Sequence, residues 1–150
     1  PLRLVGSEMC IRDSLGSIQN ELFDLGAELS TPRSDKLNSL SIVETQVDRI
    51  EEEIDQLNIN LESLKSFVLP GGTPASSYLH QARTVIRRAE RLMVSLSLTE
   101  EGAVSEIALK YINRLSDLCF VAARYANQTD TGGQGDTLWR PGQTNFDEKI

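Results

Sequence analysis

An unbroken run of apolar residues at alternating steps of four and three occupies positions 43–64 of this 150-residue chain. The run comprises Val43, Val47, Ile50, Ile54, Leu57, Leu61 and Leu64. Such steps keep side chains on one face of an α-helix, whereas a β-strand requires steps of two. Acidic residues lie between the apolar ones, at Glu44, Asp48, Glu51, Glu52 and Asp55. We therefore expect a long amphipathic helix that ends near Phe67, with one buried seam and an acidic face in solvent.

A shorter helical stripe lies nearer the start of the chain. Its apolar residues also step by three and four, namely Leu15, Ile18, Leu22, Leu25 and Leu29. Ser14 or Asp13 is a suitable N-cap for this helix, and Pro32 ends it. Residues 1–14 show no clear period, so we expect them to be a disordered or non-native leader ahead of the helical domain.

A compound helix breaker, Leu-Pro-Gly-Gly-Thr-Pro, fills residues 69–74 and precedes a third helix. Pro70 cannot continue a helix, and the two glycines allow positive φ angles. Thr73 is the expected N-cap, with Pro74 at the first helical position, where its missing N–H has no cost. We expect the third helix to run to about Ser97, with an apolar face made of Tyr78, Leu79, Ala82, Val85, Ile86, Ala89, Leu92, Met93 and Leu96.

A fourth helix is expected from a cap at Thr99 to about Asn127, because Glu100 and Glu101 suit the positive end of a helix dipole. Its expected buried face comprises Val104, Ile107, Ala108, Tyr111, Ile112, Leu115, Leu118, Cys119, Ala122 and Tyr125. Residues 128–150 are rich in Gly and polar residues and are predicted to be a flexible tail. Strand-like alternation does not occur, so residues 15–127 are predicted to form an all-α, up-and-down bundle of about four helices.

Composition and charge exclude several classes of function. With 15 basic and 22 acidic residues the net charge is −7, which disfavours a nucleic-acid partner. One histidine is too few for most zinc sites, and two cysteines cannot form a disulfide framework. We therefore predict no metal site and a reducing, intracellular location. The sequence contains no apolar run of the roughly 20 residues that a membrane span needs, so no membrane partner is expected.

The densest charged segment is basic, although the protein is acidic. Residues 83–91 contain Arg83, Arg87, Arg88, Arg91 and a single acid, Glu90. The planar guanidinium group of arginine matches two phosphate oxygens, so such a cluster suits a polyphosphate ligand. The alternative is a solvated helix face with local ion pairs, because runs of charge commonly have no further role.

Asn113 and Phe67 could extend such a site. Asn113 can both donate and accept hydrogen bonds, which suits a base or ribose edge, although an ordinary exposed amide is the simpler interpretation. It is expected to share with Asp117 and Arg124 the side of the fourth helix opposite its core face. Phe67 would either close the end of the bundle or offer an apolar surface to a large, flat ligand.

Three other features have an ordinary interpretation. His80 lies off the apolar stripe and is expected to be solvent-facing or satisfied by a partner. Cys119 lies on the core face and is expected to be a small buried hydrophobe. Residues 132–137 superficially suggest a phosphate loop, but they follow no strand and open no helix.

Several segments together resemble the PduO-type ATP:cob(I)alamin adenosyltransferases. The resemblance covers roughly residues 15–127 and rests on residues 18–29 (IQNELFDLGAEL), 67–72 (FVLPGG), 79–83 (LHQAR), 87–91 (RRAER), 113–117 (NRLSD) and 123–127 (ARYAN). It implies a five-helix, ferritin-like bundle that assembles as a homotrimer, with active sites between subunits. The implied reaction moves the 5′-deoxyadenosyl group of ATP onto the cobalt of cob(I)alamin and releases triphosphate, with Mg²⁺ accompanying the ATP.

The resemblance also implies roles for individual residues. Those similar to the family's ATP-binding residues are Arg87, which is also the implied catalytic residue, Arg88, Glu90, Arg91 and Asn113. Arg83 matches an arginine that makes an intersubunit ion pair next to the site. Phe67 matches an aromatic residue that packs under the corrin ring and keeps the lower axial ligand off cobalt.

The sequence departs from the family pattern at its N-terminal end. The family's Gly/Thr-rich ATP loop and its first helix, with an Asp-Glu-Leu-Asn-type motif, are not recognised here. The resemblance thus implies a truncated member in the cytoplasm, or in the mitochondrial matrix of a eukaryote. The alternative function is a non-enzymatic helical-bundle interaction module that uses the acidic helix. The arginine segment, Phe67 and Asn113 together favour the enzyme.

Overall fold

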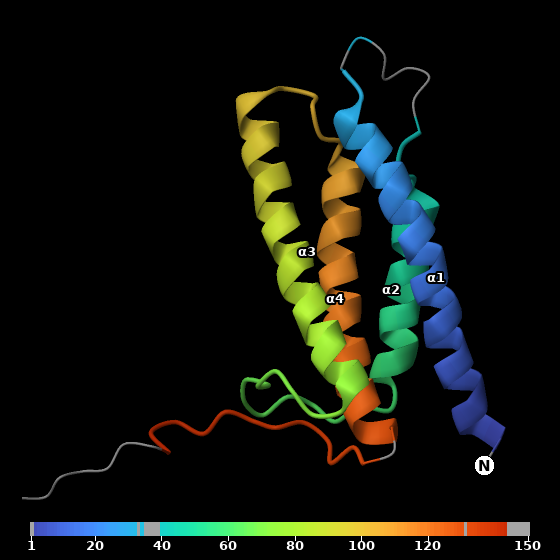
Figure 1. The fold of residues 1–150 in the computed structure, drawn as a ribbon, viewed down its shortest axis with the longest axis vertical. Coiled ribbons are helices and arrows are strands. Elements are labelled where there is room, and N and C mark those ends of the chain that lie inside the picture. Colours follow the sequence, from blue (N-terminus) through green and yellow to red (C-terminus); the bar gives the residue numbers. More distant parts are fainter. Residues whose placement is uncertain (1, 33, 35–39, 131, 144–150) are drawn as a thin grey trace, which may run out of the picture.

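The computed structural model describes residues 2–32, 34, 40–130 and 132–143, with side chains from residue 11 onward. Its helices are α1 (Leu2–Ser30), α2 (Glu44–Asn58), α3 (Pro74–Thr99) and α4 (Glu106–Thr129). They run alternately up and down (Figure 1), and within the described residues the only strand pairing is an isolated bridge. The predicted all-α, up-and-down bundle is confirmed, whereas the division into leader, bundle and tail stays a prediction.

Helix α4 forms the centre of the bundle. It packs against α3 and α2 as its main neighbours and against α1 to a lesser extent. Its buried apolar residues follow the predicted face and include Ala108, Tyr111, Ile112, Leu115, Leu118, Cys119, Ala122 and Tyr125. The other helices contribute Ile18, Leu25, Val47, Ile50, Leu57 and Met93 to the same core. Removal of these side chains from water is the main force that holds the helices together.

Helix α1 begins at Leu2, so the predicted start at residue 15 is wrong. Ser14 does not cap this helix, because its hydroxyl donates to Glu53 of α2. Asp13 is also inside the helix, where its carbonyl accepts from Ser17 Oγ at 3.2 Å. An apolar stripe marks only the buried face of a helix, so the lack of one in residues 1–14 did not exclude helical backbone.

Helix α2 ends at Asn58, well before the predicted end near Phe67. Leu61 and Leu64 continue the apolar stripe in sequence but lie beyond the helix, and Leu64 is half exposed. Asn58 and Asn60 flank the end, and asparagine competes with helical hydrogen bonding through its own side chain. Periodicity of apolar residues therefore overestimated the length of this helix.

The start of α3 follows the prediction and the start of α4 does not. Thr73 caps α3, since its side chain accepts from the N–H of Ser76 at 3.2 Å. Thr99 is the last residue of α3, so it cannot cap α4. Ser105 has that role and accepts from the N–H of Ala108 at 3.1 Å.

The predicted apolar face of α3 is wrong in part. Tyr78, Val85 and Leu92 are exposed and stand seven residues apart, so they form a stripe that α4 does not cover. Met93 of the predicted face is buried, and so are Ser76 and His80, which the prediction did not include. A helix whose apolar residues extend around more than one side shows the same periodicity, and sequence alone does not tell which side faces the neighbour.

The turn before α3 is built around the buried side chain of Asn127. Asn127 Oδ1 accepts from the N–H of Thr73 at 2.9 Å, and Nδ2 donates to the carbonyl of Gly71 at 3.0 Å. Gly72 has a φ of +101°, and a β-carbon at this position would lie 2.0 Å from Asn127 Oδ1. The end of α4 thus fixes where α3 begins, and glycine is required at position 72 by both space and backbone conformation.

We predict that Gly72→Ala and Asn127→Ala are energetically coupled. Gly72→Ala should destabilise the protein through the clash and through a positive-φ cost of about 1–2 kcal/mol. In the Asn127→Ala background the clash is absent. The destabilisation caused by Gly72→Ala should therefore be smaller there by about 1 kcal/mol or more. Urea unfolding of the four proteins measures this coupling. Gly71→Ala is the matched control, because φ is +138° there and nothing lies within 4 Å. Equal costs of Gly72→Ala in both backgrounds would contradict the prediction.

Candidate functional site

Three of the five residues predicted to bind ATP meet where α3 contacts α4. Glu90 of α3 accepts from Asn113 Nδ2 of α4 at 2.8 Å and forms an ion pair with Arg87, one turn earlier on α3. The Glu90 side chain is mostly buried, whereas that of Arg87 is half exposed. One carboxylate therefore fixes the positions of both a cation and an amide.

Arg88 and Arg91 lie on the exposed surface of α3. Arg91 Nη1 donates to the carbonyl of Arg87 at 3.2 Å, which draws its guanidinium back toward the preceding turn. Together with Arg87 these residues place three exposed cations within two turns of one helix. Such a local concentration of positive charge attracts anions even though the protein as a whole is acidic.

A groove of about 590 Å³ opens beside Glu90 and Asn113, between α2, α3 and α4. Its charged lining residues are Glu44, Glu51, Glu90, Glu106, Lys110 and Arg114. Four carboxylates against two cations repel a polyphosphate rather than hold it. The exposed Arg87, Arg88 and Arg91 are not among the residues that line this groove.

Arg83, predicted to form an intersubunit ion pair, lies over an aromatic ring of its own chain. Its guanidinium carbon is 4.7 Å from the ring centroid of Phe120, a cation–π geometry. The ring of His80 approaches the same Phe120 ring edge-on, with centroids 6.3 Å apart. Phe120 thus orders the first turn of the basic segment.

Phe67 lies in the segment between α2 and α3, apart from the arginines. Arg87 is about 20 Å along the axis from the start of α3, at about 1.5 Å per residue. Phe67 is 76% exposed, which excludes the alternative interpretation that it closes the end of the bundle. Its ring stands edge-on to Trp139, with centroids 5.9 Å apart. Trp139 was not among the residues predicted from the sequence. A single tryptophan after a Gly-rich segment could have indicated it.

Arg124 is buried, so the prediction that it faces away from the core is wrong. Its Nε donates to Asp136 Oδ2 at 2.7 Å, and its Nη2 donates to the carbonyl of Glu62 at 2.7 Å. The pairing with Asp136 was not predicted from the sequence, because Asp136 belongs to the predicted flexible tail. The other oxygen of Asp136, Oδ1, and Nε2 of His80 are both buried without a hydrogen-bond partner. The expectation that His80 is solvent-facing or satisfied by a partner is therefore wrong.

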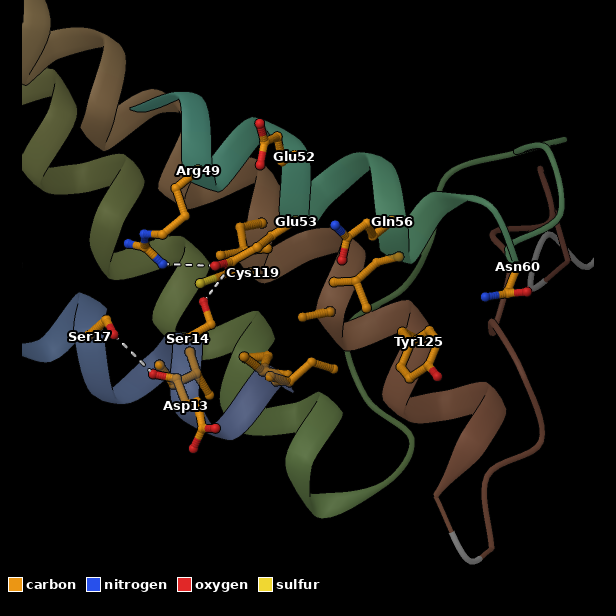
Figure 2. Close-up of a pocket in the computed structure, with 16 residues that line it drawn as sticks. Asp13, Ser14, Ser17, Arg49, Glu52, Glu53, Gln56, Asn60, Cys119 and Tyr125 are labelled. Carbon is orange, nitrogen blue, oxygen red and sulfur yellow. Dashed lines mark hydrogen bonds and ion pairs between the residues drawn. The ribbon is translucent and has the colours of Figure 1, made fainter. Parts of the chain in front are cut away.

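A second polar cluster lies between α1, α2 and α4, at a cavity of about 610 Å³ (Figure 2). Arg49 bridges Glu21 at 2.7 Å and Glu53 at 2.8 Å. The buried hydroxyl of Tyr111 donates to Glu21 at 2.7 Å, and burial together with this contact raises the pKa of the phenol. None of the predicted site residues lines the cavity, and the contacts of the cluster join α1 to α2 and α4.

Cys119 lies in the wall of the same cavity (Figure 2) and is nonetheless buried. Burial raises the pKa of its thiol to about 11. A thiol of that kind is not a nucleophile at neutral pH, so the expected role as a small buried hydrophobe is confirmed.

Within the described ranges, no group of three or more His, Cys, Asp or Glu side chains is placed to hold a metal ion. The same residues include no helix that is both long and apolar enough to cross a membrane.

Comparisons with known proteins agree on one family. The family model of cobalamin adenosyltransferases matches residues 3–126. A corrinoid adenosyltransferase of Mycobacterium leprae is 49% identical over 146 residues, which are 94% of this chain and 74% of that protein. The mouse corrinoid adenosyltransferase MMAB is 42% identical over 118 residues, which are 76% of this chain and 49% of that protein.

Solved structures give the same result. A variant of the PduO-type ATP:corrinoid adenosyltransferase of Lactobacillus reuteri, in complex with cobalamin and ATP, superposes with a TM-score of 0.78. It is 43% identical and covers 85% of this chain and 69% of its own. A second variant of the same protein, in complex with ATP, superposes with a TM-score of 0.79 at 40% identity, covering 90% of this chain and 74% of its own.

We predict that His80 makes stability fall as the pH is lowered. Burial, and then the nearby charge of Arg83, lower its pKa below 6.5, so the unfolded chain binds a proton more readily than the folded one. Below about pH 6.5 this difference in proton binding lowers the free energy of unfolding by up to about 1.4 kcal/mol per pH unit. Urea unfolding at pH 7, 6 and 5 should show the gap between the wild type and His80→Gln narrowing as the pH falls. Parallel pH profiles would exclude this role.

Proposed function

The chain belongs to the cobalamin adenosyltransferase family, and from this premise we propose that it transfers the 5′-deoxyadenosyl group of ATP to cob(I)alamin. In this reaction cobalt(I) supplies both electrons of the new cobalt–carbon bond to C5′ of the ribose. The bond between C5′ and the phosphate oxygen breaks, and triphosphate leaves with its electron pair. The observation that carries the proposal is the basic face of α3, organised by the Arg87–Glu90–Asn113 contact.

The proposed ATP site consists of Arg87, Arg88, Glu90, Arg91 and Asn113. Negative charge grows on the leaving triphosphate, and cations already fixed in place stabilise it without reorganisation. We assign the catalytic role to Arg87. Its guanidinium is fixed by Glu90, and its side chain is half exposed, so it can contact the leaving triphosphate. Glu90 also orients the Asn113 amide, whose carbonyl oxygen stays available to a donor on ATP. Mg²⁺ would enter bound to the phosphates of ATP.

The proposed corrinoid site is the exposed ring of Phe67. An aromatic face against the lower side of the corrin excludes water and other axial ligands from cobalt. Without a lower ligand, cobalt(II) is more easily reduced to the nucleophilic cobalt(I) state. The cofactor-like corrinoid carries the difficult chemistry, and the protein supplies position and an apolar surface.

We further propose a homotrimer in which neighbouring subunits complete the site. The exposed stripe of Tyr78, Val85 and Leu92 lies on the same helix as the arginines, so a second copy packed on it would also border the basic face. An exposed apolar stripe of this kind is typical of a protein–protein contact. Arg83, one turn before Arg87, is proposed to pair with an acid of that neighbour. The proposed location is the cytoplasm, or the mitochondrial matrix in a eukaryote.

We predict that Arg87→Ala lowers kcat by about 100-fold or more, because one preorganised charge is lost from the triphosphate site. The trimer should persist in size-exclusion chromatography, since Arg87 is a half-exposed surface residue. Lys110→Ala is the control, because Lys110 is an exposed cation of α4 in an ion pair with Glu44. Near-wild-type turnover of Arg87→Ala would refute the phosphate role.

We predict that Phe67→Ala mainly impairs the use of cob(II)alamin under reducing conditions. Loss of the ring lets an axial ligand approach cobalt from below, so the bound cobalt(II) is harder to reduce. Electron paramagnetic resonance of bound cob(II)alamin should change from the wild-type signal toward that of the free corrinoid. Phe23→Ala, at an exposed phenylalanine of α1, is the control. Identical spectra of wild type and Phe67→Ala would rule out this role.

A further inference from the structure

The segment that carries Phe67 is paired with residues 134–140, which we call the C-terminal strap. The N–H of Trp139 donates to the carbonyl of Phe67 at 2.8 Å, and Ser66 Oγ donates to the carbonyl of Trp139 at 2.8 Å. The N–H of Leu69 donates to the carbonyl of Thr137 at 2.8 Å. Figure 1 shows the strap, in red, passing beneath the green segment between α2 and α3. The backbone on both sides of Phe67 is therefore held by the strap.

Phe67 depends on this backbone support because its ring has little other support. The ring is largely exposed and meets Trp139, itself a residue of the strap, edge-on. A side chain outside the core is not positioned by close packing. The place of the Phe67 ring is thus set by the place of the strap.

The strap is in turn joined to the bundle by the ion pair between Arg124 and Asp136. The side chains of these residues are only 7% and 17% exposed. A second contact is the N–H of Gly135, which donates to the carbonyl of Asn127 at 2.9 Å. Both contacts come from the last two turns of α4, so the strap is fixed to the central helix.

Arg124 also holds the other side of the pairing. Its Nη2 bonds the carbonyl of Glu62, in the segment that leads from α2 to Phe67. A cavity of about 470 Å³ lies between residues 61–65 and 133–138, with Arg124 in its wall. The two segments therefore do not pack tightly against one another at this point. One guanidinium group instead spans the space and fixes their separation.

Burial of an ion pair is a poor way to gain stability, because desolvation offsets much of the attraction between the charges. The forked geometry of arginine does, however, fix two acceptors relative to each other. Lysine offers a point charge and cannot satisfy both acceptors in the same directions. The contacts of Arg124 with Asp136 and Glu62 are therefore better suited to fixing the two segments relative to each other than to stabilising the fold.

We propose that Arg124 and Asp136 are positioning residues for Phe67, which hold the strap and the Phe67 segment together so that the ring is in place for a corrinoid. This inference rests on the proposed function, since it supplies the reason why the Phe67 ring must be fixed. Neither residue touches the reacting atoms, and both act through Phe67.

The first test uses Trp139, the only tryptophan of the chain, as a probe of the strap. The variants are Asp136→Asn, which removes the charge from the acceptor, and Arg124→Lys, which keeps the charge but removes the fork. In both, Trp139 emission should shift to the red and acrylamide quenching should increase. Asp117→Asn is the matched control, because Asp117 pairs with Arg114 on the exposed surface of α4 at 2.8 Å. Far-ultraviolet circular dichroism checks that the helices persist.

The second test measures how the two variants bind and use the corrinoid. In both variants the KM for the corrinoid should rise by about tenfold, as expected for loss of one hydrogen bond to a charged group, while the KM for ATP stays unchanged. The electron paramagnetic resonance signal of bound cob(II)alamin should move toward that of the free corrinoid. A residue that served stability alone would not separate the two KM values.

Unchanged Trp139 emission and quenching in both variants would overturn the proposal, because the strap would then be held by something else. Shifted emission with an unchanged corrinoid KM and an unchanged cobalt(II) signal would also overturn it, since Phe67 would not depend on the strap. A wild-type protein that binds no corrinoid would instead refute the proposed function, and the role for Phe67 would fall with it. The Trp139 fluorescence needs no ligand. It therefore tests whether Arg124 and Asp136 hold the strap even if the protein binds no corrinoid.

Discussion

Polar side chains buried along α4 must find hydrogen-bond partners, and this requirement ties the rest of the chain to the central helix. Buried Tyr111 is bonded to α1, buried Arg124 to the C-terminal strap and buried Asn127 to the turn before α3, and the partly buried Asn113 is bonded to α3. An unsatisfied polar group in the core costs about 1–3 kcal/mol, so each of these contacts selects one arrangement of its segment over others. The apolar face of α4 brings the helices together, and its polar residues decide how they are placed.

The two parts of the proposed site have the same construction. In each, a functional group stands in solvent while its support is buried. Arg87 is exposed, but the Glu90 carboxylate that holds it is mostly buried against α4. The Phe67 ring is exposed, but its backbone is tied to a strap that ends on the buried Arg124. Surface groups held in this way keep their positions before a ligand arrives, which suits a reaction whose main demand is alignment.

The sequence was sufficient for the type of fold and for the start of α3, but not for the start of α4, where Ser105 and not Thr99 is the cap. The seam of α2 and the face of α4 followed from apolar spacing, and Thr73 followed from its position before Pro74. Helix ends were less predictable, because apolar residues continue past the end of α2. The buried state of Arg124 was missed because its partner lies in a Gly-rich segment without periodicity. Such a pairing depends on where the chain turns back after α4, which spacing does not encode.

Gly72 shows how two distant positions come to depend on each other. The place where its side chain would begin is already taken by the amide oxygen of Asn127. In the course of evolution a larger residue at position 72 would need a smaller one at position 127, and it would still carry the cost of the positive φ angle. A change at position 72 before that at position 127 would pass through a protein in which the start of α3 is displaced. Lineages that diversify this turn should therefore record the substitution at position 127 first.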